Sequence, residues 1–473
     1  MSTGVKVGQA PQARVAVVGG GLAGLAASCA LADAGYRITL FERRPYLGGR
    51  ASSYEHPGTG EVVDNCQHVL LGCCTNLLDF YSRLGVAEKI RWYDKLTFIA
   101  PGGKQGIIAP SKLPAPLHSS PAFLRFPLLS AVDKLCIVRA MLALLKGIPD
   151  DERDFLSWLK SKGQSQSVID RFWSPVLVSS LNEDLDKVSV RYGAMVFRDG
   201  FLKSAEAGRM GVPTIPLSDL YGVAAEYIAS RGGEVRLRCP VERVETVANG
   251  VSLKAGGESE TFDYVVSAVP FHALARLLPA DNATEHVAED LNKLETVPIT
   301  GIHLWFDREI TPLEHAVLLE RTIQWMFQKS KIQQRAQGGP LGAGSYLELV
   351  VSASKTLVQM PRAQVIELAM RELAEFFPTV KDARLLKATV IKEVHATFAP
   401  APGSDPYRLK PRSPWPQVFL SGDWTDTGWP ATMEGAVRAG YLSAQALTAA
   451  HGRSQQFLVP DLPPRGLMNL FPH

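Results

Sequence analysis

The sequence has no large excess of charge of either sign. Its 473 residues include 50 Lys and Arg against 47 Asp and Glu, and the formal net charge is +3. Proteins that bind nucleic acid usually concentrate basic residues, so we do not expect nucleic acid as a partner. Long apolar runs are also missing. The nearest approach, residues 135–145, contains Arg139 and is shorter than the roughly 20 residues that cross a bilayer. We therefore expect no membrane-spanning helix.

Cysteine is scarce, with six residues in the whole chain, too few for a dense disulfide framework. Residues 1–14 are polar and contain no apolar signal core, so we expect a cytoplasmic, reduced protein. Cys66, His68 and the adjacent Cys73 and Cys74 lack the paired spacing of zinc ligands, and a bridge between neighbouring cysteines would be strained. This stretch thus predicts small buried thiols and no metal site.

Apolar residues and turn residues are abundant. Hydrophobic residues make up 46% of the chain, which suffices for a large core and excludes a disordered chain. The 40 glycines and 32 prolines indicate many turns, and the length suggests roughly two to four domains. Residues 76–209 are especially rich in Leu, Phe and Pro, which marks a second domain.

A run of glycines joins the first predicted strand, residues 14–18, to the first predicted helix, residues 22–34. With a second strand at residues 37–41, these elements have the size of a βαβ crossover. The turn fits G-x-G-x-x-G, in which the first glycine permits the turn, the second lets a pyrophosphate approach, and the third lets the helix pack closely. The helix N-terminus binds phosphate, and an acid after the second strand binds ribose hydroxyls. The residues predicted for this dinucleotide site are Gly19, Gly21, Leu22, Ala23, Gly24 and Glu42.

Glycines and charges recur in two other segments near strand ends. The first follows Glu42 directly and forms a tight turn with cations beside the anion site. It contains Arg43, Gly48, Gly49 and Arg50. The second follows a predicted strand at residues 418–420 and opens a helix. It contains Gly422, Asp423, Thr432, Met433 and Glu434.

The first segment resembles the E-x-R-x-x-x-G-G-R motif of the flavin amine oxidase and phytoene desaturase superfamily. The second resembles that superfamily's closing FAD motif. Residues 238–241 and 267–270 resemble its middle FAD segment, where the backbone of Val241 would meet the adenine. The resemblance implies FAD as the cofactor. The carboxylate of Asp423 would accept ribityl hydroxyls, and the helix N-terminus at Thr432 would stabilise the charge of a reduced flavin.

The three segments lie far apart in the sequence, so the nucleotide site needs both ends of the chain. We expect an α/β fold, with a Rossmann-like FAD-binding domain of the GR2 type and an interleaved α+β substrate domain. The predicted FAD-binding domain comprises residues 12–75, 212–298 and 385–452. The predicted substrate and membrane-facing domain comprises residues 76–211 and 299–384, followed by a C-terminal tail, residues 453–473.

One branch of the superfamily is more similar than the others. Residues 64–74, DNCQHVLLGCC, resemble the DN-x-QHVLLGC segment of hydroxysqualene dehydroxylases, and residues 428–436 fit the same branch. Cys66 departs from the wider superfamily, which commonly has glycine there, and this puts the local backbone conformation in question. The resemblance implies reductive removal of the allylic hydroxyl of hydroxysqualene, giving squalene for hopanoid biosynthesis, with an unknown electron donor to FAD.

Such a reaction needs an acid near the flavin, and His68 and Asp64 are the titratable groups in the branch-specific segment. Both have a plainer interpretation: Asp64 can cap a turn, and His68 can bond to the backbone. Three alternative functions also stay open. A carotenoid or phytoene-type desaturase would use the flavin in the oxidative direction, and an amine oxidase would need a polar cation-binding cavity. A non-catalytic isoprenoid carrier of this fold, like the Rab GDP-dissociation inhibitors, would not need the intact Glu42, Gly422 and Asp423.

A C30 hydrocarbon lives in the bilayer, so such an enzyme needs a surface that reaches it. Residues 121–129 and 136–148 mix apolar side chains with cations, which suits an interfacial amphipathic element. The alternative is an ordinary helix–helix contact inside the substrate domain. The cations are Arg125, Lys134, Arg139 and Lys146. We expect a peripheral protein on the inner face of the cell membrane.

Overall fold

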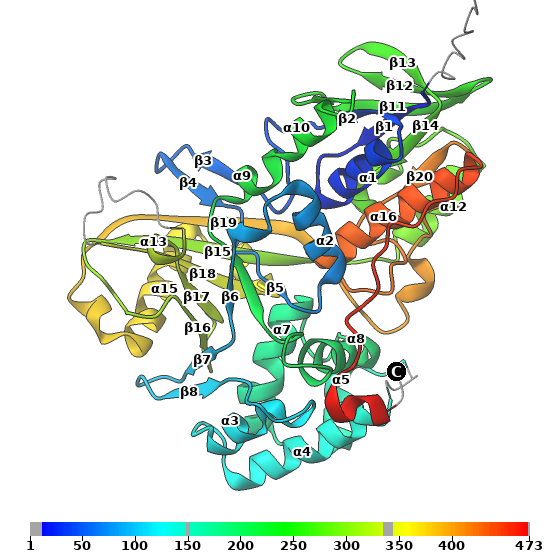
Figure 1. Ribbon diagram of the computed structural model, residues 1–473. Coiled ribbons are helices and arrows are strands. Elements are labelled where there is room, and N and C mark those ends of the chain that lie inside the picture. Colours follow the sequence, from blue (N-terminus) through cyan, green and yellow to red (C-terminus); the bar gives the residue numbers. More distant parts are fainter. Residues whose placement is uncertain (1–11, 148–151, 334–343, 472–473) are drawn as a thin grey trace, which may run out of the picture.

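A five-stranded parallel sheet forms the centre of the nucleotide-binding part. The computed structural model describes residues 12–147, 152–333 and 344–471 (Figure 1). The strand order is β10-β2-β1-β14-β20, and every neighbouring pair is parallel. The strands are β1 (Arg14–Val18), β2 (Arg37–Phe41), β10 (Glu234–Arg236), β14 (Tyr264–Ser267) and β20 (Val418–Leu420). Strands from three distant stretches of the chain therefore form one sheet.

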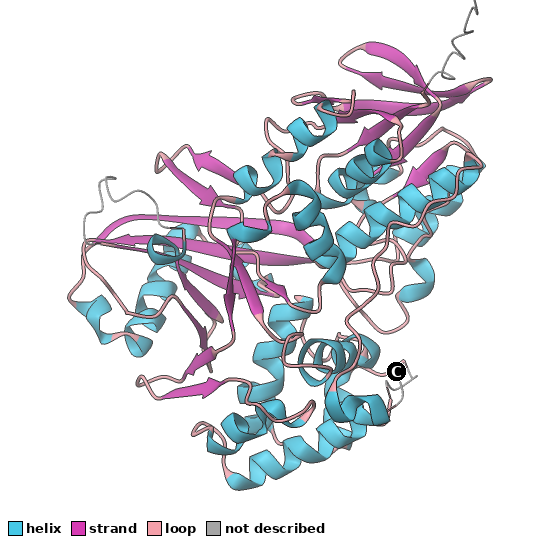
Figure 2. Cartoon of the chain, viewed as in Figure 1, coloured by secondary structure: helices cyan, strands magenta, loops and turns pink. Residues whose placement is uncertain are grey.

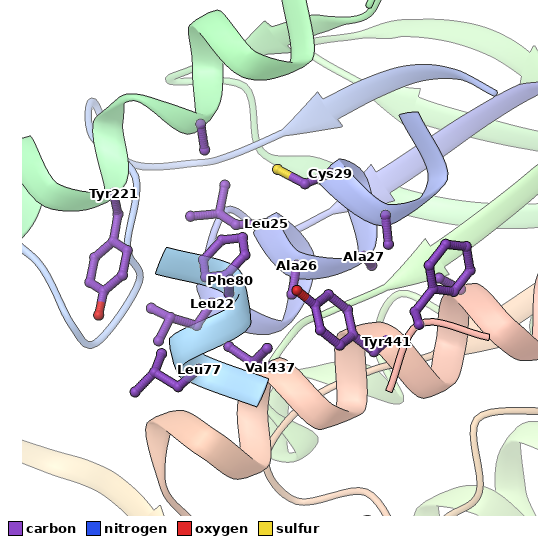
Figure 3. Packing of buried hydrophobic residues seen from close by; sticks show 14 of the residues in the cluster. Leu22, Leu25, Ala26, Ala27, Cys29, Leu77, Phe80, Tyr221, Val437 and Tyr441 are labelled. Carbon is purple, nitrogen blue, oxygen red and sulfur yellow. The ribbon is translucent and has the colours of Figure 1, made fainter. Parts of the chain in front are cut away.

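Two closely packed helices cover one face of this sheet. α1 (Leu22–Asp33) is apolar and almost wholly buried, and α16 (Met433–Ala450) packs along it (Figures 1 and 3). The helices can approach because Gly440 has no side chain: a Cβ there would lie 2.4 Å from the carbonyl oxygen of Ala23. α2 (Thr75–Leu84) packs against both helices. Figure 3 shows the apolar side chains at this junction, among them Leu22, Ala26, Leu77, Phe80 and Val437.

A small antiparallel sheet covers the opposite face. It consists of β11 (Val241–Val247), β12 (Gly250–Ala255) and β13 (Glu258–Phe262). Val244, Leu253 and Phe262 of this sheet share an apolar cluster with Ala16 and Val18 of β1. The helices α11 (Phe271–Leu274) and α12 (Asn282–Leu291) add to the cluster. The parallel strands are thus buried on both faces, which explains their continuous apolar sequences.

A seven-stranded sheet forms the second part (Figure 2), in the order β19-β15-β18-β17-β16-β7-β8. Its strands are β7 (Leu96–Ile99), β8 (Gln105–Ile108), β15 (Thr296–Phe306), β16 (His315–Leu318), β17 (Trp325–Gln328), β18 (Ser345–Ser352) and β19 (Leu385–Phe398). Helix α15 (Arg362–Phe376) shares an apolar cluster with it. β19 pairs with β15 along its length, although the predicted boundary at residue 385 assigns it to the nucleotide-binding domain. Hydrogen bonding to β15 places β19 in this sheet, and the sequence alone does not show which strand β19 pairs with.

A group of helices packs at one end of this second sheet. Its members are α3 (Ser120–Arg125), α4 (Ala131–Leu145), α5 (Phe155–Ser161), α6 (Gln166–Val168), α7 (Ser174–Leu181) and α8 (Val190–Met195), with the π-helical turns η3 (Ile169–Trp173) and η4 (Val196–Leu202). They surround a core rich in aromatic residues, including Phe155, Trp158, Trp173 and Phe197. Within the described ranges, no helix combines the length and apolar character needed to span a bilayer.

The remaining elements are short. The strands are β3 (Ser53–His56), β4 (Glu61–Asp64), β5 (Leu70–Leu71), β6 (Ile90–Tyr93) and β9 (Met210–Pro213), and the helices are α9 (Leu217–Gly222), α10 (Ala224–Ala229), α13 (Lys329–Ile332) and α14 (Lys355–Gln359). The 3₁₀ turns are η1 (Ala87–Lys89), η2 (Leu117–Ser119), η5 (Pro378–Lys381), η6 (Asp405–Tyr407) and η7 (Gly466–Leu470). Parts of the predicted segments lie outside the described residues: residues 1–11, residues 148–151 and 334–343 of the predicted substrate domain, and the last two residues of the tail.

Replacing Gly440 by Ala tests the contact between α1 and α16. The added methyl group would overlap the Ala23 carbonyl, so we expect the free energy of unfolding to fall by about 2 kcal/mol, measured by urea denaturation. The control is Gly222→Ala in α9, where a Cβ meets nothing within 4 Å. This control should be neutral or slightly stabilising. Equal stability of the two variants would contradict the role given to Gly440.

Candidate functional site

The glycine turn after β1 leaves an anion site at the start of α1. Gly19 has a φ of 108°, and a Cβ on Gly24 would lie 1.9 Å from the carbonyl oxygen of Gly19, so both positions require glycine. Gly21 is the N-cap of α1, and no described side chain caps this helix. The first backbone N–H groups, including those of Leu22 and Ala23, are therefore available to a phosphate.

The turn at Gly48 and Gly49 closes over this site. Gly21 and Gly48 form an isolated parallel β-bridge. Gly49 has a φ of 62°, and a Cβ there would lie 2.9 Å from the Cα of Gly21. The two glycine segments, predicted separately from the sequence, thus form one cradle of bare backbone.

Glu42 is fixed at the end of β2. Its buried carboxylate accepts a hydrogen bond from the backbone N–H of Gly20 at 2.7 Å. The backbone N–H of Cys239 donates to the carbonyl of Glu42 at 2.9 Å, which brings the start of β11 at Val241 close to the same edge. The Arg43 side chain is exposed. The predicted adenosine-binding residues therefore lie together.

An ion pair joins the first glycine segment to the C-terminal one. Nη2 of Arg50 lies 2.6 Å from Oδ1 of the buried Asp423, although 373 positions separate them. Arg50 also donates to the carbonyl of Ala396 at 2.5 Å. Gly422 has a φ of 148°, and a Cβ there would lie 2.4 Å from the indole nitrogen of Trp424. The glycine thus lets the chain turn directly beside the Asp423 carboxylate.

The N-terminus of α16 completes this group of residues. Thr432 caps the helix by accepting a hydrogen bond from the backbone N–H of Gly435 at 3.0 Å, and Met433 is the first helical residue. The buried carboxylate of Glu434 is already engaged. It accepts from the backbone N–H of Leu77 at 2.7 Å and from Nε of Arg438 at 2.7 Å. Glu434 therefore holds α16 against α2 and has little capacity left for a cofactor hydroxyl.

Asp64 belongs to a buried charge cluster with Lys329 and Glu348. Nζ of Lys329 lies 2.5 Å from Oδ2 of Asp64 and 3.4 Å from Oε2 of Glu348. Burial opposes the charge on Lys329, but the two carboxylates outweigh it and raise the pKa of this ammonium. Burial also opposes the charge on Asp64, but Lys329 and the hydroxyl of Ser53 hold the pKa of Asp64 below its usual value. Asp64 is thus ionised and paired.

Glu348 is the second carboxylate beside a single ammonium. Burial, together with the charge of Asp64, raises the pKa of Glu348 to about 7 against the opposing effect of Lys329. Among the described residues, neither of its oxygens has a hydrogen-bonding partner of normal geometry. Glu348 lies on the same face of β18 as Val350 and Ser352, because side chains two positions apart in a strand point the same way. The cluster therefore contains a carboxyl group whose pKa lies close to neutral pH.

His68 is bound to the backbone. Its Nδ1 lies 2.7 Å from the carbonyl oxygen of Cys66, which can only accept, so Nδ1 carries the proton. Burial lowers the pKa of His68, which favours the neutral ring. A neutral imidazole protonated at Nδ1 offers Nε2 as an acceptor and is a weak proton donor. The role of His68 as the acid stays a prediction.

The cysteines near His68 are small packed groups. Cys66, Cys73 and Cys74 are buried, and each of the six cysteines is a free thiol. Burial raises the pKa of Cys66 well above its usual value, so this thiol is protonated and unreactive. Within the part of the chain that the structure describes, no group of three or more His, Cys, Asp or Glu side chains is arranged to hold a metal.

An apolar cavity of about 220 Å³ lies between the nucleotide-binding part and the second part. Its lining comes from the start of α16, from β5 and α2, and from β7, β17, β18, α7 and η4 of the second part. Most of its lining is Leu, Val, Phe, Met, Trp and Pro. The polar or charged lining residues are Gln67, Ser179, Ser180, Asp199, Ser352, Thr432 and Glu434. Gln67 and Phe327 of this lining also border Glu348.

Sequence reasoning missed Lys329 and Glu348. A signal for Glu348 exists, since it is the one charged residue in the otherwise largely apolar stretch 345–352. A charge at the centre of a buried strand requires a partner. Lys329 gives no comparable signal, because it begins a short helix, α13, and lies 265 positions from Asp64.

The family described as "Flavin containing amine oxidoreductase" matches residues 22–448. The chain belongs to this family. Two curated proteins that this chain resembles are desaturases. The 15-cis-phytoene desaturase of Capsicum annuum is 28% identical over 94% of this chain and 80% of its own. The zeta-carotene desaturase of Zea mays is 28% identical over 91% of this chain and 82% of its own.

A solved structure of putrescine oxidase bound to putrescine superposes with a TM-score of 0.70. It is 16% identical and covers 93% of this chain and 99% of its own. This likeness confirms the predicted fold class, and the family match confirms FAD as the cofactor. The residues described above fit that cofactor, because an uncapped helix N-terminus with a glycine cradle suits a pyrophosphate, and Glu42 and Asp423 offer carboxylates for hydroxyls. The chain is thus an FAD-dependent oxidoreductase.

Replacing Asp423 by Ala tests the C-terminal half of the FAD site. Loss of the carboxylate removes an acceptor and the partner of Arg50, so we expect FAD to bind about tenfold more weakly or worse. Flavin fluorescence released during dialysis measures this affinity. The control is Asp426→Ala, three residues further on, where the side chain is exposed. If both variants retain FAD like the unaltered protein, Asp423 does not hold the cofactor.

Proposed function

We propose that this enzyme reduces hydroxysqualene to squalene in squalene and hopanoid biosynthesis, working on the cytoplasmic face of a membrane. The observation that carries the proposal is the apolar cavity between the start of α16 and the second part. A long hydrocarbon with one hydroxyl suits this lining, because apolar burial binds the chain and a few polar groups orient the hydroxyl. The similarity of residues 64–74 to hydroxysqualene dehydroxylases supports the choice of substrate.

The reaction needs a proton and a hydride equivalent. The allylic C–O bond breaks, the hydroxyl takes up a proton and leaves as water, and the carbon gains an electron pair and a hydrogen. Bound, reduced FAD supplies the hydride equivalent. The protein has to supply the proton and to keep other water from the electron-poor carbon.

We assign the proton donor to Glu348, with Lys329 and Asp64 as its support. Burial raises the pKa of Glu348 to about 7, and the residue lies beside the lining residues Gln67 and Phe327. After the proton leaves, Lys329 at 3.4 Å stabilises the new carboxylate. Asp64 keeps Lys329 charged through their contact at 2.5 Å. This assignment differs from the sequence prediction, in which Asp64 or His68 is the acid.

A second candidate is desaturation of a linear polyisoprene. It is favoured by the names of the relatives, 15-cis-phytoene desaturase and zeta-carotene desaturase, each 28% identical to this chain. The same apolar cavity would suit that substrate class. The two reactions run the cofactor in opposite directions, since desaturation removes electrons from the substrate and hydroxyl removal adds them. They can therefore be separated by the redox state of the flavin supplied.

An anaerobic assay with purified holoenzyme tests the choice. With hydroxysqualene and dithionite-reduced FAD we expect squalene, identified by gas chromatography and mass spectrometry. With oxidised FAD we expect none. In a parallel assay the holoenzyme is supplied with phytoene, oxidised FAD and a quinone acceptor. Conversion of phytoene with no squalene formed from hydroxysqualene would replace the first proposal by the second. A protein that purifies without bound flavin and converts neither substrate would favour the isoprenoid carrier.

Replacing Glu348 by Gln tests the proton donor. The amide has similar volume and no acidic proton, so we expect turnover to fall about 100-fold or more. In the unaltered enzyme, turnover should fall as the pH rises through about 7, because Glu348 must be protonated to act. The control is Glu372→Gln, a buried glutamate of α15 that accepts from the backbone N–H of Ile323 at 3.0 Å. Retention of turnover and of the pH profile in E348Q would rule out this donor.

A further inference from the structure

Helix α4 is apolar on both sides, which is unusual for a helix at the surface of a protein. Its inner side chains, Ile137, Ala140 and Leu144, are buried in the aromatic core of the helical group. Its outer side chains are also apolar. Val132 is 70% exposed and Leu135 is 71% exposed, and Val138 and Leu142 lie on the same exposed side. Burial within this chain therefore accounts for one side of the helix and not for the other.

Two other segments extend this apolar face. Leu124 of the neighbouring α3 is 64% exposed, and Nζ of Lys134 in α4 donates to its carbonyl at 2.7 Å. The C-terminal turn η7 carries the exposed Leu467 and Leu470. The backbone N–H of Leu467 donates to the carbonyl of Ala115 at 2.8 Å, and Met468 of η7 shares an apolar cluster with Ala115 and Leu145. Figure 1 shows α3, α4 and the C-terminal turn at the same end of the molecule.

Cations surround the apolar side chains. Residues 120–147 contain Arg125, Lys134, Arg139 and Lys146 and a single acidic residue, Asp133. Asp133 is engaged in the N-terminal cap of α4, where its side chain bonds to Ser130. A second copy of this chain, facing the same surface, would bring like charges together. An anionic bilayer offers both an apolar interior and charges of the opposite sign.

We propose that the outer faces of α3, α4 and η7 dock on a bilayer that contains anionic lipid. The docked apolar side chains are Leu124, Val132, Leu135, Val138, Leu142, Leu467 and Leu470. This docking face rests on the proposed function, in which a squalene-like substrate is drawn from a bilayer. The turn η4 lies between the docking face and the cavity: it contacts α4, and Val196, Asp199 and Phe201 of η4 line the cavity. A substrate that leaves the bilayer at this face would therefore pass η4 to reach the cavity.

Sedimentation of the full-length holoenzyme with vesicles tests the docking face. The vesicles are phosphatidylcholine alone or phosphatidylcholine with phosphatidylglycerol. We expect the unaltered protein to sediment with the anionic vesicles, and the double variant Leu135→Glu, Leu142→Glu to reduce the bound fraction about tenfold. Arg139→Glu should weaken binding to anionic vesicles and leave binding to neutral vesicles unchanged. The matched control is Val247→Glu, Leu386→Glu, which replaces two exposed apolar residues outside this face.

The outcomes separate docking from catalysis. Failure of the unaltered protein to bind anionic vesicles, or equal binding of both double variants, would overturn the docking face. A protein that is dimeric by size-exclusion chromatography, and that L135E/L142E makes monomeric, would assign the face to a second copy instead. With substrate dispersed in detergent, L135E/L142E should turn over like the unaltered enzyme. Loss of the proposed reaction with intact vesicle binding would overturn the function and leave the docking face standing.

Discussion

The direct packing of α16 on α1 is the contact through which both ends of the chain reach one nucleotide site. The absence of a side chain at Gly440 sets the distance between these helices. Because α16 is rigid, that distance also fixes Thr432 at its N-terminus, and the turn before it carries Asp423 to Arg50. The first half of the site, built on the glycine turn, would bind only the pyrophosphate and the adenosine. Binding of the flavin end of the cofactor also requires Asp423 and Thr432 to be held at a fixed position relative to the glycine turn.

The buried cluster of Lys329 with two carboxylates is costly to keep. Moving charges out of water is unfavourable, and apolar side chains of similar volume at the same positions are often at least as stabilising. The cluster contains two carboxyl groups, those of Asp64 and Glu348, but a single ammonium group, that of Lys329. Glu348, with a pKa raised to about 7, can therefore take up or release a proton beside residues that line the cavity, and Lys329 stabilises the carboxylate that proton loss leaves. Such an arrangement suits proton transfer better than it suits stability.

The local parts of this structure follow from the sequence. β1, β2 and β20 have the predicted bounds, because apolar periodicity and flanking turn residues determine them locally. The cofactor residues could be predicted because each motif has a fixed spacing. Residues 217–229 form two short helices, α9 and α10, and Gly222, the last residue of α9, lies at the break between them. Lys329 and the pairing of β19 with β15 depend on contacts between distant segments, which a single sequence does not display.

The C-terminal segment after α16 runs across both parts of the molecule. The backbone N–H groups of Phe457 and Leu458 donate to the Gln445 side chain of α16, and that of Val459 donates to Asn76 of α2. Further on, the N–H of Arg465 donates to the carbonyl of Lys203, just after η4. One continuous strap thus leads from the helix that faces the cofactor to the turn η7. Because it is bonded to both parts, the strap ties the helix at the cofactor site to the turn at the outer end of the molecule.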